Sequence, residues 1–457
     1  MSKRHGSIVF IMIMSTQLFF HNILFCTTFT VTKTTDTRSS GTTGELRWAI
    51  QKVNSTSTGQ PHKITFNISG TGPFTIKPKN DLPAITRPVT IDGFSQRGAK
   101  ANSLAVGNNA VMKIILSGNN YATGNAYNGS GNGLFFSNGS AGSVVKGLVI
   151  NSWINTGITI YNANNITLSG NFIGTNVSGT TQAANQAGIF IISSNNTSIG
   201  SSSPADRNVI SGSFFFFNES SCIVLDSATG TKIKGNYVGT NASGTAILGN
   251  SLAGITCFAA NNTIIGGPTT AEGNVISGHV IVGIEIESSS NCLIQKNYIG
   301  TNAAGTSALG NLNMGISLGG SGIANSTIGN TIYANVISGN NIGIKIGFMS
   351  SLGTNQNTIT NNFVGTNYTG KLKIPNSYGI IINDNNNTFN RNVISGNTIG
   401  GFLLYGGAQN NKIQNNYIGL DATKTVTMPN GYNIQLGLLG ARGAAGQNTI
   451  QNNMFGR

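Results

Sequence analysis

Charged side chains are scarce in this chain: they make up 8% of its 457 residues, and only 12 of them are acidic. Apolar residues account for 39%, and there are 62 glycines. An intrinsically disordered chain would combine few apolar residues with a high charge, so that class is excluded. Many short strands joined by tight glycine turns would produce this composition, and we therefore expect an all-β protein.

Cysteine is also rare, with four residues at Cys26, Cys222, Cys257 and Cys292. Cys26 falls at the end of a predicted export signal, which leaves three in the mature chain. An odd number without any CxxC spacing indicates neither a disulfide framework nor a zinc site. We interpret the three as small buried apolar residues, and a Cys222–Cys257 or Cys257–Cys292 disulfide remains the alternative.

Basic residues exceed acidic ones, 26 to 12, which gives a formal net charge of +14. Half of the basic residues precede position 114. The chain has no run of basic residues and no nucleic-acid-binding motif, so we expect no nucleic-acid partner. We interpret the excess as a lightly charged, solvated surface; the alternative is an affinity for polyanions such as acidic glycans.

The N-terminal segment 1–28 has the character of a secretory signal. Basic residues at 3–5 precede an apolar stretch at 8–25, and cleavage after Cys26 or Thr28 is expected. An uncleaved anchor is the alternative, although three polar residues interrupt the stretch and weaken a membrane span. No other segment is long and apolar enough to cross a membrane, so we expect a secreted or cell-surface protein.

Internal repetition is the strongest signal in the sequence. One motif, Asn-aromatic-Ile/Val-Gly-Thr-Asn, occupies 171–176, 236–241, 297–302 and 362–367, with a degenerate copy at 416–421. It alternates with a second motif, NVISG, which starts at Asn208, Asn274, Asn335 and Asn392. A third marker, Gly-Ile-x-Ile or a close variant, starts at Gly133, Gly157, Gly188, Cys222, Gly254, Gly283, Gly315, Gly343, Gly379, Gly401 and Asn433.

The third marker recurs every 22–36 residues and counts one coil each time, about eleven coils in all. Around it, apolar residues alternate with others, as in Ile284/Ile286, which is the two-residue period of a strand. A leucine-rich repeat or a propeller would need patterns that are absent. The sequence predicts a right-handed, single-stranded parallel β-helix with an inward Ile/Val core and Asn ladders at corners with φ > 0.

Residues 42–54 break the repeat. Their apolar residues are spaced as on one face of a helix, so one short amphipathic helix is predicted. Strands are predicted at 64–68, 74–76 and 89–91, and together these elements would cap the open end of the solenoid. The predicted organisation is a signal at 1–28, a cap with the first strands at 29–105 and β-helix repeats at 106–457.

The segments GELRWAI, KITFNI and LPAITRPVTIDG resemble the cap of bacterial surface proteins of the CSLREA-domain type. Residues 90–118 and the IGTN and NVISG repeats are similar to right-handed β-helix repeat proteins of the same group. The resemblance covers essentially all of the mature chain, and it implies the fold and export rather than an activity. The family's loop motif often reads IGTD, whereas this chain has Asn at 176, 241, 302 and 367 and keeps only Asp421. Because a column of Asn is a weak ligand set, neither calcium nor another metal or cofactor is predicted.

Many parallel β-helices are polysaccharide lyases, hydrolases or epimerases, so we consider catalytic candidates. The best cluster is Glu285 and Glu287, which point outward from one strand about 7 Å apart. Asp226 shares a column with Glu287 two coils earlier, and Lys345 shares that of Glu285 two coils later, about 10 Å away. We favour the simpler interpretation that these four are solvated outward positions.

Other chemical groups are isolated. Asp206-Arg207 is interpreted as a loop-end pair, and Asp92 as a turn former. His62 and His279 have no partner at nucleophile or metal spacing. The run Phe214–Phe217 is expected to pack inward or under a loop, with an apolar contact patch as the alternative.

The leading hypothesis is an exported or surface-exposed β-helix that acts as a binding, adhesin-like or structural module toward glycans or a surface partner. The alternative is a carbohydrate-active enzyme, a polysaccharide lyase or glycoside hydrolase, on the outer face of the solenoid. The sequence indicates neither the ligand nor the oligomeric state.

Overall fold

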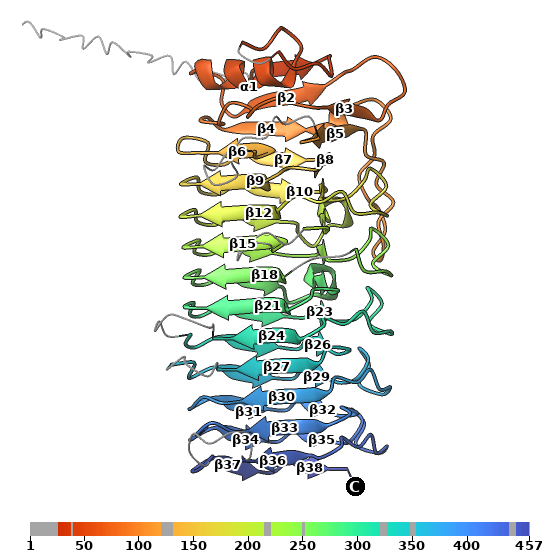
Figure 1. The fold of residues 1–457 in the computed structure, drawn as a ribbon, viewed down its shortest axis with the longest axis vertical. Coiled ribbons are helices and arrows are strands. Elements are labelled where there is room, and N and C mark those ends of the chain that lie inside the picture. The colour runs from red at the N-terminus through yellow and green to blue at the C-terminus, as the bar shows by residue number, and fades with distance from the viewer. Residues whose placement is uncertain are drawn as a thin grey trace, which may run out of the picture.

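The computed structural model of the chain describes residues 26–37, 40–119, 131–213, 221–248, 252–319, 327–347, 353–437 and 445–456. Over these residues the chain winds into a solenoid of three long sheets, with the helix α1 (Leu46–Ser55) over its N-terminal end (Figure 1). Neighbouring strands within each sheet pair in parallel. The structure thus confirms the predicted parallel β-helix.

From Val89 to Leu436 the chain visits the three sheets in turn, and each coil adds one strand to each; the strands before Val89 belong to the first two sheets only. The first sheet comprises β1 (Thr28–Val31), β2 (His62–Phe66), β4 (Val89–Asp92), β7 (Val144–Lys146), β10 (Thr167–Ser169), β13 (Ser198–Ile199), β16 (Lys232–Ile233), β19 (Ile264–Gly266), β22 (Leu293–Gln295), β25 (Thr331–Tyr333), β28 (Thr358–Thr360), β31 (Thr388–Asn390), β34 (Lys412–Gln414) and β37 (Thr449–Gln451). The second comprises β3 (Phe74–Ile76), β5 (Ile114–Ser117), β8 (Leu148–Asn151), β11 (Phe172–Ile173), β14 (Val209–Ile210), β17 (Tyr237–Val238), β20 (Val275–Ile276), β23 (Tyr298–Ile299), β26 (Val336–Ile337), β29 (Phe363–Val364), β32 (Val393–Ile394), β35 (Tyr417–Ile418) and β38 (Met454–Phe455). The third comprises β6 (Leu134–Phe136), β9 (Thr156–Tyr161), β12 (Ala187–Ile192), β15 (Ile223–Asp226), β18 (Ala253–Phe258), β21 (Val282–Glu287), β24 (Met314–Leu318), β27 (Ile342–Ile346), β30 (Tyr378–Ile382), β33 (Gly400–Leu404) and β36 (Ile434–Leu436).

The Gly-Ile markers lie at the strands of the third sheet, and the packing shows why glycine is used there. A Cβ on Gly283 would lie 2.7 Å from the carbonyl oxygen of Gly315 in the next coil. Real Cβ atoms do not approach a backbone oxygen so closely, so a side chain here would push two coils apart. The marker therefore records a close backbone contact between neighbouring coils.

The core is a continuous column of inward apolar side chains. Ile284 pairs with Ile255 in the preceding coil and with Ile316 in the next, and all three are fully buried. The same cluster runs from Val31 in the cap to Ile418 near the other end. Because the strands are in register, like side chains stack on like, and the two-residue period seen in the sequence fixes which face is buried.

Asparagine ladders run through the interior at the corners, as predicted. The amide of Asn236 donates to Asn274 Oδ1 at 3.1 Å and in turn accepts from Asn208 at 2.9 Å. The expected positive φ is found one residue earlier, for example at Lys296 (φ 53°), rather than at the ladder asparagine itself. The preceding residue turns the chain, and the asparagine side chain then bonds to backbone groups of the preceding coil, as Asn236 does to Asn208 and Ile199, and to the asparagine side chain of the next coil.

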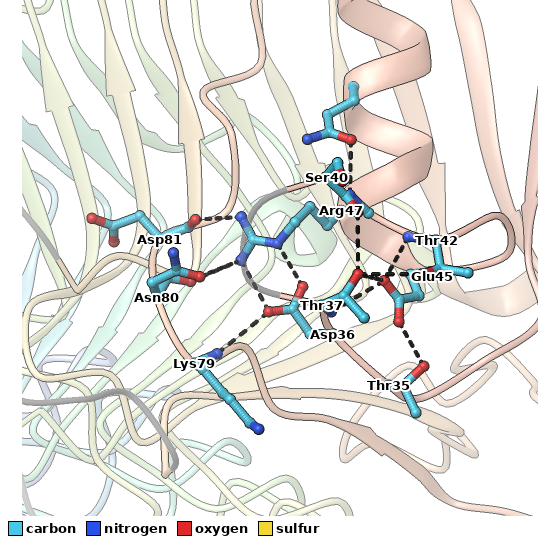
Figure 2. A network of polar contacts seen from close by, with 12 residues as sticks. Thr35, Asp36, Thr37, Ser40, Thr42, Glu45, Arg47, Lys79, Asn80 and Asp81 are labelled. Atoms are coloured by element: carbon cyan, nitrogen blue, oxygen red, sulfur yellow. Dashed lines mark hydrogen bonds and ion pairs between the residues drawn. The ribbon is translucent and has the colours of Figure 1, made fainter.

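The N-terminal cap is held by a buried polar network (Figure 2). Helix α1 buries the apolar stripe predicted from the sequence, and β2 lies two residues earlier than predicted. Arg47, on this helix, donates to Asp36 at 2.7 Å and to the carbonyl oxygen of Asp81 at 2.7 Å. Burial alone would raise the pKa of Glu45, but hydrogen bonds from Thr35, Thr42 and Thr37 lower it to about 2. Both charged groups are therefore compensated inside the cap.

A long connection between β4 and β5, which we term the strap (residues 96–113), leaves the cap and runs along the solenoid (Figure 1). It folds back on itself through an antiparallel bridge between Lys100 and Val111. The backbone N–H of Gly107 donates to the hydroxyl of Tyr237 in β17 at 2.7 Å. The strap thus ties the N-terminal coils to a coil more than a hundred residues later.

The predicted signal lies almost wholly outside the described residues, which begin at Cys26. Thr28 is the first residue of β1 and pairs with Lys63, so cleavage after Thr28 would remove one residue of a paired strand. Within the described part of the chain, no helix is both long and apolar enough to cross a bilayer.

Candidate functional site

The four candidate residues lie on the outer side of the third sheet, which we term the carboxylate face (Asp226, Phe258, Glu285, Glu287 and Lys345). In one column Asp226 pairs with Phe258, and Phe258 with Glu287. In the other, Glu285 pairs with Ser317, and Ser317 with Lys345. The two-coil offsets predicted from the sequence are therefore found in the register. They correspond to about 10 Å along the axis, because each coil adds about 4.8 Å.

The carboxylates of this face are partly withdrawn from water. Glu285 and Glu287 are both half-buried. Burial raises the pKa of Glu285, and the neighbouring charge of Glu287 raises it further. The pKa of Glu287 is also raised by burial, and that of Lys345 is lowered by burial. The neutral forms of Glu285, Glu287 and Lys345 are therefore favoured more than in open water.

The geometry of the glutamate pair permits acid–base chemistry without requiring it. Outward neighbours on one strand are about 7 Å apart at their Cα atoms, so the two flexible side chains can bring their carboxyl groups to either side of one sugar linkage. A raised pKa suits a general acid. In the described residues, no group of three or more His, Cys, Asp or Glu side chains is placed to hold a metal ion.

The pair Asp206-Arg207 lies at the end of the short turn η3 (Pro204–Asp206), as the sequence predicted, but the two side chains have different partners. Asp206 accepts a hydrogen bond from Ser201 at 2.6 Å. Arg207 is buried and donates to the carbonyl oxygens of Leu104 and Ala105 in the strap, at 3.0 and 2.8 Å. Its anchoring role has no signal in the sequence, because its partners are about a hundred residues away in a segment without repeats.

The isolated histidines are buried. His62 Nε2 lies 2.9 Å from the carbonyl oxygen of Thr56. His279 takes an asparagine position in a corner ladder, where its backbone N–H donates to Asn311 Oδ1 at 3.1 Å. Burial lowers the pKa of His279 to about 4, so it is neutral at pH 7. Asp92 forms a turn as predicted, accepting from the backbone N–H of Phe94 at 3.0 Å.

The IGTN loops use their last residue to close a hairpin. Asn241 Oδ1 accepts the backbone N–H groups of Thr245 and Ala246, at 2.9 and 3.2 Å. Asp421 does the same in the last loop, at 3.0 Å from Thr425. An amide and a carboxylate oxygen serve this purpose equally, so the change from Asp to Asn preserves the loop.

The three cysteines of the solenoid, Cys222, Cys257 and Cys292, are buried and form no disulfide, as the leading interpretation expected. Burial raises the pKa of Cys292 to about 11, which keeps the thiol protonated. The Phe214–Phe217 run lies outside the described residues.

No family model matches this sequence, and no curated protein matches it either. Among solved structures, the chain is similar to the mannuronan C-5 epimerase AlgE6 A-module of Azotobacter vinelandii, with 11% identity over 90% of this chain and 94% of that chain and a TM-score of 0.47. It is also similar to PfbA, a surface adhesin of Streptococcus pneumoniae, with 13% identity over 87% and 89% and a TM-score of 0.47. An alginate lyase from Paenibacillus shares 14% identity over 89% and 97%, with a TM-score of 0.39. Similarities of this size carry no statement about activity.

Proposed function

We propose that the chain is an exported β-helix module that binds glycans on the carboxylate face of its third sheet. The observation that carries this proposal is the column Asp226–Phe258–Glu287, in which an aromatic ring lies between two carboxyl groups on successive coils. Export rests on the predicted signal at 1–28.

The chemistry of that column suits a sugar. One face of a pyranose ring is rich in C–H groups and packs on an aromatic ring, while its hydroxyls donate to carboxylate oxygens. Phe258 is partly exposed and can offer its ring, and the acids lie one coil, about 4.8 Å, to either side. The same column continues through Ile192 to Tyr161, a residue that is 44% exposed, so a chain of sugars could lie along the solenoid axis.

A second candidate function is carbohydrate cleavage, and one observation favours it. The pKa of Glu285 is raised by burial and by Glu287, which is the direction that a carboxylic acid needs to serve as a general acid. In a hydrolase Glu285 would act as the acid and Glu287 as base or nucleophile. In a lyase the pair would neutralise a uronate, with Lys345 as base.

The test is to incubate the purified chain with a panel of acidic and neutral polysaccharides, and to measure both binding and the release of unsaturated or reducing ends. We expect binding without turnover, and we expect Phe258→Ala to weaken it by about tenfold, because an aromatic platform contributes about 1 kcal/mol or more. Phe190→Ala is the matched control, since Phe190 points outward from the same sheet in the other column.

Two outcomes would contradict the binding module. Turnover that disappears in the double variant Glu285→Gln/Glu287→Gln would establish the enzyme instead. Equal losses of binding in the Phe258→Ala and Phe190→Ala variants would remove the proposed column as the site.

A further inference from the structure

A polar groove lies on the outer side of the first sheet, on different strands from the carboxylate face. It has a volume of about 330 Å³, and its floor is made by β10, β13 and β16 from three successive coils. Its walls are the turns that contain η3 and η4 (Thr270–Glu272). Those turns belong to the segments before NVISG, so the same insertion in two different coils builds both walls.

One column of the floor carries hydrogen-bond donors and no acid. Thr167 pairs with Ser198, and Ser198 with Lys232, so two hydroxyls and an ammonium follow one another about 4.8 Å apart. Lys232 is exposed. Among the described residues no carboxylate lies within ion-pair distance of it, because the ion pairs found there are Arg47–Asp36, Lys146–Asp92 and Lys234–Glu272. This column therefore presents an uncompensated positive charge.

The other column is electrically balanced. Lys234 forms an ion pair with Glu272 at 2.9 Å, and the carboxylate of Glu272 also accepts from the backbone N–H of Thr269 at 3.0 Å. Gly200 has no side chain to occupy the groove, and there is no room for one, since a Cβ there would lie 2.2 Å from the carbonyl oxygen of Lys234 in the next coil. The charge of Lys234 is already neutralised, which leaves Lys232 as the cation available to a ligand in the groove.

The wall at η3 is fixed before any ligand arrives. Asp206 holds Ser201 at 2.6 Å, and directly behind it Arg207 donates to the carbonyl oxygen of Gly235 at 3.1 Å and to the strap. The guanidinium also lies over the ring of Tyr237, 4.7 Å from its centroid. A groove whose walls are already ordered loses little entropy on binding.

We propose that this groove binds a uronate unit of an acidic oligosaccharide, with the sugar carboxylate at Lys232 and at the hydroxyls of Thr167 and Ser198. The ring hydroxyls of the sugar would meet Asp206 and Ser169, which also line the groove. A cavity of this size holds a single sugar unit with its neighbours extending along the sheet. This site goes beyond the proposed function, because it lies on another sheet and recognises a charge.

The experiment is a calorimetric titration of the purified chain with a galacturonate tetrasaccharide, with its methyl ester and with a sulfated tetrasaccharide of equal length. We expect the free acid to bind, and Lys232→Gln to weaken it by about tenfold, as for the loss of one charge-assisted hydrogen bond. Lys412→Gln is the matched control: Lys412 is also exposed, stands in the same column of the first sheet and lies outside the groove. Melting temperatures check that both variants fold.

Binding that survives in Glu285→Gln/Glu287→Gln while it is lost in Lys232→Gln separates this site from the carboxylate face. The proposal is overturned if the methyl ester binds as tightly as the acid, or if Lys412→Gln weakens binding as much as Lys232→Gln, since the net charge of the protein would then be responsible. Tighter binding of the sulfated sugar by more than tenfold would overturn the assignment to a uronate.

Discussion

The outer faces of the third and first sheets carry similar charged side chains in opposite electrostatic situations. On the third sheet Glu285 and Glu287 lie side by side, and burial raises the pKa of both. On the first sheet Glu272 lies against Lys234, and the hydrogen bond from that lysine lowers the pKa of Glu272. The strands, the coil spacing and the core are the same on both sides. For these glutamates, the direction of the pKa shift therefore follows from whether a cation from a neighbouring coil reaches the carboxyl group.

The largest expected effect comes from removing the core that supports both faces. Ile286 lies between Glu285 and Glu287, Ile233 lies between Lys232 and Lys234, and both are fully buried. Replacing either by alanine should cost about 2–5 kcal/mol of unfolding free energy. Denaturant midpoints of the two variants should fall by similar amounts. A loss at one site only would mean that the two faces rest on parts of the solenoid with separate stability.

The second-largest expected effect is the contribution of His279 to the pH dependence of stability. It would mask the smaller contributions of the glutamates on the two faces. The pKa of His279 in the folded chain is lowered to about 4, so the folded state binds fewer protons than the unfolded state between about pH 4 and 6.5. Stability is therefore lost as pH falls through this window, on the order of 3 kcal/mol. The substitution His279→Asn should abolish this dependence and complete the corner ladder. Thermal unfolding from pH 7 to 4 measures it, and an unchanged slope in the variant would contradict the assignment.

In a chain with His279 replaced, Glu272, in the η4 turn beside the first sheet, should make the free energy of unfolding fall as the pH is lowered. Because the folded pKa of Glu272 is lowered, its contribution is present above the ordinary glutamate pKa and is lost as pH falls through the lowered value. Glu272→Gln should therefore destabilise the chain at pH 7, by about 0.2–1 kcal/mol, as expected for a partly exposed ion pair. The penalty should vanish in acid. A penalty that stays constant as the pH falls from 7 through the acid range would show that packing, not charge, is lost.

The smallest expected effect is that of Glu285, which should make the free energy of unfolding fall as the pH is raised. Because the folded pKa of Glu285 is raised, the folded state holds the proton more tightly, and stability falls as pH rises above about 4. Glu285→Gln should leave stability unchanged in acid and raise it at pH 7, by less than about 1 kcal/mol. Urea unfolding of Glu285→Gln beside Glu272→Gln at both pH values gives the contrast directly. If both substitutions destabilise the chain at pH 7, the proposed contrast between the two glutamates is wrong.

Much of the fold was predictable from the sequence because each coil repeats the same pattern of buried and outward residues. The Gly-Ile marker locates each strand of the third sheet, and the two-residue period fixes which residues point outward. For that reason the columns that contain Asp226, Glu285, Glu287 and Lys345 follow from the repeat alone, two coils apart as the register has them.

The groove and the strap were not predictable in the same way. Arg207 appears in the sequence as one half of a loop-end pair, yet its partners are the strap and Gly235. The strap has no repeat, so no period relates Leu104 to Arg207 across about a hundred residues. The positive φ also falls before the ladder asparagine, since a corner is closed by two residues with separate tasks. Repeats predict the contacts that neighbouring coils have in common, but they do not predict the contacts made by a single insertion such as the strap.

The strap has a mechanical consequence. Its contacts join a segment that leaves the cap to Arg207 and Tyr237, so the coils between them cannot separate one at a time. Under a pulling force applied at the two chain ends, coils near β38 would peel off singly, each giving up its own contacts. The section clamped by the strap would instead resist until the clamp ruptured, and would then release several coils together. Force–extension curves would show small, even steps followed by one large step, with the section beside the cap yielding last.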